Sequence, residues 1–141
     1  MFRHKKPEHA GASLADVAFF EGFSTDELDR VAELASEADA EEGALLMDQG
    51  RPGMECFVIL EGEAGVFVRD EHIATLGAGD MVGEMALIDH KPRSASVVAA
   101  TPMRLLAFDT KRFRTLLDEM PKASQRVAEL LNARLRSRNA S

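Results

Sequence analysis

The feature that most constrains the fold of this chain is a series of short apolar runs, spread from about residue 38 to residue 109 and separated by glycine-containing turns. In order along the chain, the runs read ALLM, CFVIL, AGVFV, IATL, SVVAA and MRLLAF. The turns between them contain Gly43, Gly50, Gly53, Gly62, Gly77 and Gly79. Several short strands divided by such turns are typical of a β-sandwich or a barrel, so we predict a mainly β fold.

Helical patterns flank the predicted strands. Upstream, Ser24 with Glu27 three residues later indicates a capping box, and an apolar helix face follows it. That face comprises Leu28, Val31, Leu34 and Ala35. Downstream, Asp109 is suited to cap a helix, and Pro121 either ends that helix or opens the next one. The apolar residues of this downstream helix are Phe113, Leu116, Leu117 and Met120.

A last helix is predicted from about residue 121 to residue 138. Its apolar stripe consists of Ala123, Val127, Leu130, Leu131 and Leu135. Because an apolar stripe must be covered, two arrangements are open. The stripe packs on the protein's own β structure, or it meets the same helix of a second copy in a homodimer.

Composition restricts the environment and the partners. The chain has 141 residues, of which 45% are hydrophobic, and this suits one domain. No apolar run approaches the roughly 20 residues that span a bilayer, and the start lacks the apolar segment of a secretory signal, so we expect a cytoplasmic protein without a membrane segment. Residues 7–121 carry 23 acidic and 9 basic side chains, a balance that repels nucleic acid. The only cysteine, Cys56, lies in an apolar run and is expected to be a core residue.

The segment GEMALIDHKPRSASVVA, residues 83–99, carries the chemistry. Its pattern changes from strand-like to helix-like at Gly83, so the peptide N–H groups from there onward would form the start of a short helix, which is an anion site. Arg93 offers a planar fork of donors that suits two oxygens of one phosphate, and Ser94 adds a hydroxyl and another N–H. Ala95 is small enough for a ligand to approach the backbone. We therefore predict a phosphate pocket.

Glu84 is unexpected in a phosphate pocket, because a carboxylate repels an anion. It suits a ligand that also presents hydroxyl donors, as a ribose does, and a sugar with a phosphate indicates a nucleotide. The alternative is structural: Glu84 favours a helix N-terminus through the helix dipole, and Arg93 is a solvated surface residue. Spacing alone leaves both interpretations open.

The same segment resembles the phosphate-binding cassette of the cyclic nucleotide-binding domain family, which includes catabolite activator protein and the regulatory subunits of protein kinase A. The likeness continues in LLMDQGRPGMECFVILEGEAGVFV and in IATLGAGDMVGEMAL, which are similar to the family's strands and to its approach to the cassette. It implies an eight-stranded jelly-roll-like β-roll with N-terminal and C-terminal helices. The implied boundaries are a flexible tail over 1–12, one domain over 13–138 (helices 13–37, roll 38–109 with the cassette at 83–97, helices 110–138) and a tail over 139–141.

The resemblance also implies roles for individual residues. Glu84 would accept the ribose 2′-hydroxyl, and Arg93 would pair with the exocyclic oxygens of a cyclic phosphate. The backbone N–H groups of Gly83, Ala86 and Ser94 would add donors, with Ala95 at the same site. The candidate base contacts, for which a solvated helix end is the alternative, are Arg134, Arg138 and Asn139. The expected ligand is 3′,5′-cyclic AMP in preference to cyclic GMP.

We expect a sensor rather than an enzyme. The histidines are scattered with no H-x-H pair, and neither a Gly-x-Ser-x-Gly elbow nor a Walker loop is present, so no metal cofactor and no catalysis are expected. Relatives that regulate transcription continue into a helix-turn-helix, and this sequence shows no such second helical pair, so direct DNA binding is not expected. The effector would be an unidentified protein or a second copy. The alternative function is a ligand-free interaction or dimerisation module that keeps the fold.

Overall fold

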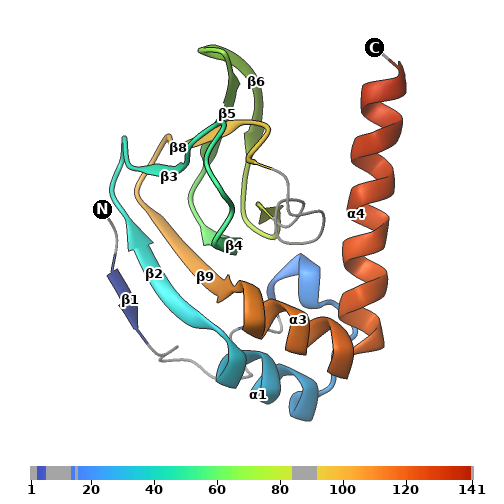
Figure 1. Ribbon diagram of the computed structural model, residues 1–141. Coiled ribbons are helices and arrows are strands. Elements are labelled where there is room, and N and C mark those ends of the chain that lie inside the picture. The colour runs from blue at the N-terminus through green and yellow to red at the C-terminus, as the bar shows by residue number, and fades with distance from the viewer. Residues whose placement is uncertain (1–2, 6–13, 15, 84–91, 141) are drawn as a thin grey trace.

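The computed structural model arranges the apolar runs in two antiparallel sheets, with helices packed against one end (Figure 1). It describes residues 3–5, 14, 16–83 and 92–140, without the side chains of residues 3–5 and 134–140. The strands are β1 (Arg3–Lys5), β2 (Ser36–Ala40), β3 (Leu45–Met47), β4 (Glu55–Glu61), β5 (Ala64–Val68), β6 (Glu71–Leu76), β7 (Met81–Val82), β8 (Ser96–Ala99) and β9 (Met103–Asp109). The helices are η2 (Ala18–Phe20), α1 (Thr25–Leu34), α3 (Thr110–Glu119) and α4 (Pro121–Ala140).

The two sheets confirm the predicted fold class. One sheet has the order β1-β2-β9-β4-β7 and the other has the order β3-β8-β5-β6. Strands β2 to β9 make the eight-stranded roll, and β1 extends one edge by pairing with β2. β1 lies inside the segment 1–12 that the sequence presented as a tail, and β2 begins at Ser36, slightly before the expected start of the roll.

The central strands β4 and β9 carry unbroken apolar sequences because both of their faces are buried. In β4, Phe57 and Ile59 belong to the core inside the roll, whereas Cys56 and Val58 belong to the core shared with the helices. β9 repeats this alternation with Leu105 and Ala107 inside and Leu106 and Phe108 toward the helices. Cys56 is fully buried, which confirms its expected role as a core residue.

The helices begin where the sequence predicts. Ser24 Oγ accepts a hydrogen bond from the Glu27 N–H at 3.1 Å, and Glu27 Oε1 accepts from the Ser24 N–H at 2.7 Å, which completes the capping box of α1. Asp109 caps α3 by accepting from the Arg112 N–H at 2.8 Å. Pro121 is the first residue of α4, a position that needs no N–H donor.

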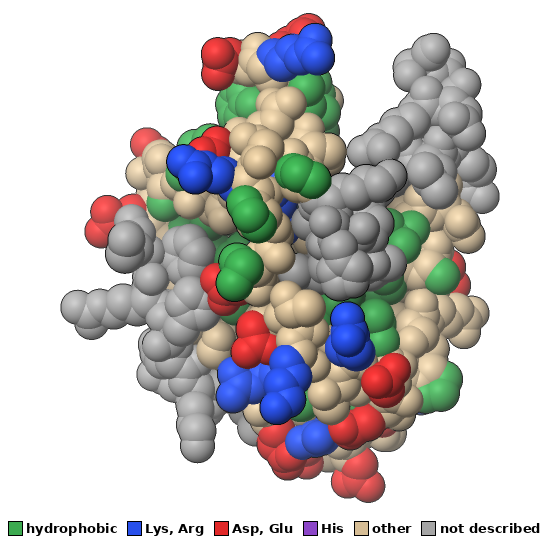
Figure 2. Space-filling model, in the orientation of Figure 1, with side chains coloured by type: hydrophobic (Ala, Val, Ile, Leu, Met, Phe, Trp, Pro, Cys, Tyr) green, Lys and Arg blue, Asp and Glu red, His purple; other side chains and the backbone are tan. Residues whose placement is uncertain are grey.

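Ion pairs join the helices at their exposed surfaces, where Figure 2 shows side chains of both charge signs interspersed. Arg30 of α1 contacts Glu119 of α3 with two hydrogen bonds of 2.8 Å. Lys122 of α4 donates to Glu27 of α1 at 2.8 Å, and this bond, with the capping bonds from Ser24, lowers the pKa of Glu27 to about 2. The first turns of α4 are therefore tied directly to α1.

The structure answers part of the question about the apolar stripe of α4. Ala123 and Val127 are buried in the core shared by the helices, and Leu130 and Leu131 are partly buried against that core. The protein thus covers the first part of the stripe itself, while the side chain of Leu135 lies outside the described residues. Within the described part of the chain, no helix combines the length and apolar character needed to cross a bilayer.

Candidate functional site

The candidate site begins where β7 ends. Met81 and Val82 pair with β4, and the chain then turns at Gly83, whose φ is +87°. A Cβ atom at this position would collide with Met47 Cε and with Arg93 Nη1. Gly83 is therefore required twice, for a left-handed backbone conformation and for the close approach of two side chains.

Arg93 lies against Gly83 although ten positions separate them in the sequence. Its residue surface is only 9% exposed, which is uncommon for an arginine. Nη1 donates to the Gly83 carbonyl oxygen at 2.8 Å, and Nη2 donates to the carbonyl oxygen of Glu55, the first residue of β4. The planar fork thus bridges the end of β7 and the start of β4, so its orientation is fixed by two elements of the roll.

The turn after β3 holds the backbone of Arg93 on both sides. The Arg93 N–H donates to the Arg51 carbonyl oxygen at 2.8 Å, and the Gly50 N–H donates to the Arg93 carbonyl oxygen at 2.9 Å. A third bond, from the Gln49 N–H to Ser96 Oγ at 2.9 Å, attaches the same turn to the start of β8. Both the main chain and the guanidinium of Arg93 are therefore positioned before any ligand arrives.

The structure brings together some of the candidate residues. Gly83 and Arg93 are in direct contact, while Ser94 is exposed and Ala95 is half-buried immediately before β8. Glu84 and Ala86, with the short helix predicted from Gly83 onward, lie outside the described residues. The candidate base contacts Arg134, Arg138 and Asn139 belong to the last turns of α4, and their side chains are likewise not described.

Two residues that position Arg93 were not predicted from the sequence, because Arg51 and Glu55 act through their carbonyl oxygens. A carbonyl is common to every residue, so no side-chain pattern signals its role. The signal that was present is the turn itself, in the sequence GRPG from Gly50 to Gly53.

A small cavity of about 170 Å³ adjoins Arg93 on the side of the turn after β3. Its lining consists of Leu46, Met47, Asp48, Arg51, Pro52, Met54, Glu55, Phe57 and Arg93. A buried guanidinium with a fixed plane is suited to hold an anion with two oxygens, such as a phosphate. Among the described residues, no group of three or more His, Cys, Asp or Glu side chains is placed to hold a metal ion.

Comparison with known proteins identifies the class. The family model of the cyclic nucleotide-binding domain matches residues 38–120, which include the roll except for the first two residues of β2, and the helix α3 that follows it. The Pycsar effector protein PaPycTIR of Pseudomonas aeruginosa is 34% identical over 111 residues, which cover 78% of this chain and 36% of that protein. The cAMP-dependent protein kinase type II regulatory subunit of Drosophila melanogaster is 30% identical over 122 residues, which cover 86% of this chain and 32% of that protein.

The fold agrees with these sequence matches. The crystal structure of the catabolite activator protein of Thermus thermophilus superimposes with a TM-score of 0.80 at 28% identity, covering 87% of this chain and 60% of the other. The chain belongs to the cyclic nucleotide-binding domain family. It spans about a third of the length of the curated relatives that it matches.

Proposed function

We propose that this chain is a cyclic nucleotide sensor without catalysis of its own, that its ligand is 3′,5′-cyclic AMP in preference to cyclic GMP, and that Arg93 holds the cyclic phosphate. Glu84 would accept the ribose 2′-hydroxyl, and backbone donors of Gly83, Ala86 and Ser94 would complete the phosphate site beside Ala95. The Drosophila relative, a regulatory subunit of a cAMP-dependent protein kinase, supports the choice of nucleotide. Base selection would fall to the end of α4, at Arg134, Arg138 and Asn139.

The observation that carries the proposal is the setting of Arg93. A solvated surface arginine would not be 9% exposed and held by the carbonyl groups of Gly83, after β7, and Glu55, in β4. The bonds to the carbonyl oxygens of Gly83 and Glu55 orient the plane of the guanidinium. Such a pre-oriented cation gains affinity for a phosphate because little side-chain entropy remains to be lost on binding.

Signalling would proceed through the C-terminal helices. The pairs Lys122–Glu27 and Arg30–Glu119 tie α4 and α3 to α1, so these helices would move together. A ligand shifts such an arrangement only if it binds the two helix positions with different affinity. An effector protein, or a second copy meeting the exposed part of α4 as a homodimer, would then detect the change.

Calorimetric titration with cyclic AMP and cyclic GMP tests the proposal. We expect saturable binding of both with the lower Kd for cyclic AMP. Arg93→Lys keeps the charge but loses the planar fork, and it should weaken binding by about tenfold or more. Arg114→Lys, an exposed position on α3, is the matched control and should leave the Kd unchanged.

Because the chain contains no Trp or Tyr, absorbance near 260 nm in the purified protein would first reveal any nucleotide carried through purification. A protein free of nucleotide that gives no heat with either ligand at millimolar concentration would contradict the sensor. That result would favour the alternative, an interaction module that keeps the fold without a ligand.

A further inference from the structure

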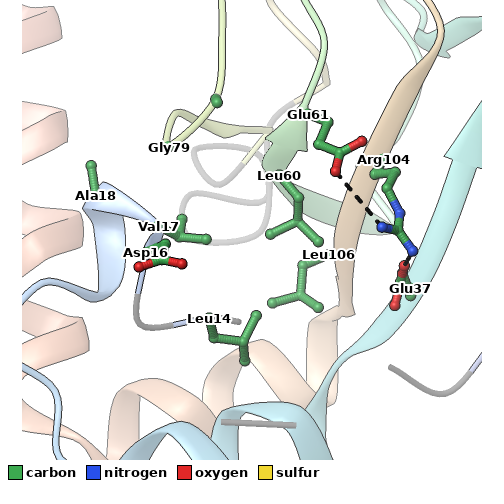
Figure 3. Close-up of a pocket in the computed structure, with 11 residues that line it drawn as sticks. Leu14, Asp16, Val17, Ala18, Glu37, Leu60, Glu61, Gly79, Arg104 and Leu106 are labelled. Carbon is green, nitrogen blue, oxygen red and sulfur yellow. Dashed lines mark ion pairs between the residues drawn. The ribbon is translucent and has the colours of Figure 1, made fainter. Parts of the chain in front are cut away.

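A second and larger cavity lies outside the roll, between the first sheet and the segment that leads into the helices (Figure 3). Its volume is about 380 Å³, within the range of pockets that hold small organic molecules. Strands β2, β4 and β9 supply one wall, and the chain around Val17 supplies the other. None of its described lining residues lines the cavity beside Arg93 or belongs to the candidate cassette site.

The base of the cavity is apolar and its mouth is lined by small residues. Leu14, Leu60 and Leu106 present their side chains to the interior, as Figure 3 shows. Leu14 and Leu106 are buried, whereas Ala18 and Ala78 are exposed and mark the opening. A compact hydrocarbon group therefore has a surface on which to pack.

The polar wall is dominated by negative charge. Glu37 is only 3% exposed, and its Oε1 lies 2.6 Å from Arg104 Nη2. Arg104 also faces Glu61 at 3.7 Å and Asp39 at 4.0 Å, so one guanidinium is shared among three carboxylates. Asp16 adds another carboxylate on the opposite wall. Among the described residues, the lining thus holds three acidic side chains and one basic one.

The geometry points to a binding site for a small amphipathic cation, with its apolar body on Leu14, Leu60 and Leu106 and its ammonium group beside Glu61, whose carboxylate is exposed. An anion would meet a surplus of negative charge in this cavity. A neutral apolar molecule would fill the base, but it would form no hydrogen bond or ion pair with the carboxylates that it removes from water. An ammonium satisfies both requirements, because it donates hydrogen bonds to carboxylates and its hydrocarbon part displaces water from the leucines.

The test uses three probes of one shape and three charges: 4-phenylbutylamine, 4-phenylbutan-1-ol and 4-phenylbutyrate. Amide shifts in ¹H–¹⁵N spectra of the whole chain, recorded at 150 mM NaCl, give both the Kd and the place of binding. We expect the amine to shift Val17, Gly79 and Leu106, with a Kd at least tenfold below that of the alcohol, and no binding of the carboxylate. Equal binding of amine and alcohol, or amine shifts scattered away from these amides, would overturn the proposal.

Two pairs of variants separate a specific site from attraction to an acidic protein. Glu61→Gln should weaken amine binding severalfold, whereas Glu63→Gln, an exposed neighbour outside the cavity, should not. Ala78→Trp should block the mouth, and Ala100→Trp, at an exposed position elsewhere, should leave binding intact. All four positions are at the surface, so folding is expected to survive. The same loss of affinity in both members of a pair would contradict a defined site, and neither outcome depends on cyclic nucleotide binding.

Discussion

Two arginines of the roll have opposite surroundings. Arg93, before β8, is almost fully buried and donates to the carbonyl oxygens of Gly83 and Glu55. Arg104, in β9, has a side chain that is one-third exposed and lies within 4.0 Å of three carboxylates. Among the contacts described, two neutral carbonyl groups orient Arg93, whereas three carboxylates surround Arg104.

This difference indicates that the guanidinium of Arg93 is suited to bind a ligand, whereas that of Arg104 stabilises the fold. The carbonyl acceptors of Gly83 and Glu55 fix the plane of Arg93, which suits an anion with two oxygens. The carboxylates around Arg104 offset its charge, and Glu37 in particular raises the pKa of Arg104. Removal of Arg93 should therefore damage binding most, and removal of Arg104 should damage stability most.

The largest expected effect is on affinity. Arg93→Ala removes the cation that the cyclic phosphate would meet, and we expect the Kd for cyclic AMP to rise by at least about 100-fold. Arg104→Ala should change that Kd far less, because Arg104 lies outside the cassette site. Calorimetry on both variants measures the contrast. A similar rise in Kd for the two variants would show that general loss of folding, rather than the phosphate contact, is responsible.

The next effect is on stability. Arg104→Ala leaves Glu37 buried without its 2.6 Å partner, so we expect a loss of about 2 kcal/mol in the free energy of unfolding, reduced from the fully buried case by the exposure of Arg104. Urea denaturation without ligand measures it. Arg93→Ala should cost less, since Gly83 and Glu55 would each lose a bond to a neutral carbonyl oxygen. Replacing the pair together, as Glu37→Leu with Arg104→Met, should recover most of the loss; a double variant as unstable as Arg104→Ala would contradict this account.

Much of the fold could be predicted from the sequence because its signals are local. The capping box at Ser24 and Glu27 is contained within four residues, and the unbroken apolar runs of β4 and β9 follow from burial on both faces. β2, with the sequence SEADA, escaped prediction because its burial depends on pairing with β9. The short β7 agrees with the strand-like pattern that ends at Gly83.

The site was predictable only in the residues whose side chains carry the chemistry. Arg93 and Gly83 stand in a motif, and the structure places them in contact. Arg51 and Glu55 hold Arg93 through backbone carbonyls, which any residue would provide. Glu37 looks like an ordinary polar residue in the sequence, because its arginine partner is 67 positions away and becomes a neighbour only when β2 pairs with β9.

Gly83→Ala tests the orientation of Arg93 separately from its charge, because it displaces the guanidinium without removing it. We expect a destabilisation of about 1–3 kcal/mol, since φ is +87° and the new Cβ would strike Met47 and Arg93. Affinity for cyclic AMP should fall by about tenfold through the displaced fork. Gly77→Ala is the matched control, because a Cβ there meets nothing within 4 Å and its φ is not positive. Urea denaturation measures the free energy of unfolding of both variants, and calorimetry measures their Kd for cyclic AMP. Equal changes in the two variants would contradict the strain expected at Gly83.

The smallest effect concerns a third charged group, Glu27, which forms an ion pair with Lys122 at the surface. The pKa of Glu27 is lowered to about 2 in the folded protein, chiefly by its bond to Lys122, so the unfolded chain binds a proton there at higher pH than the folded chain does. The stability that this carboxylate contributes is therefore complete above its usual pKa of 4.5 and is lost as the pH falls from there toward 2. Denaturation midpoints at pH 6 and pH 3 should differ less in Glu27→Gln than in the unmodified protein, whereas Glu63→Gln should preserve the full difference. Because solvent screens this pair, the loss of unfolding free energy between pH 6 and pH 3 that depends on Glu27 should be smaller than the loss caused by Arg104→Ala. A larger loss would mean that surface pairs among the helices contribute more to the electrostatic stability than Glu37 and Arg104 do.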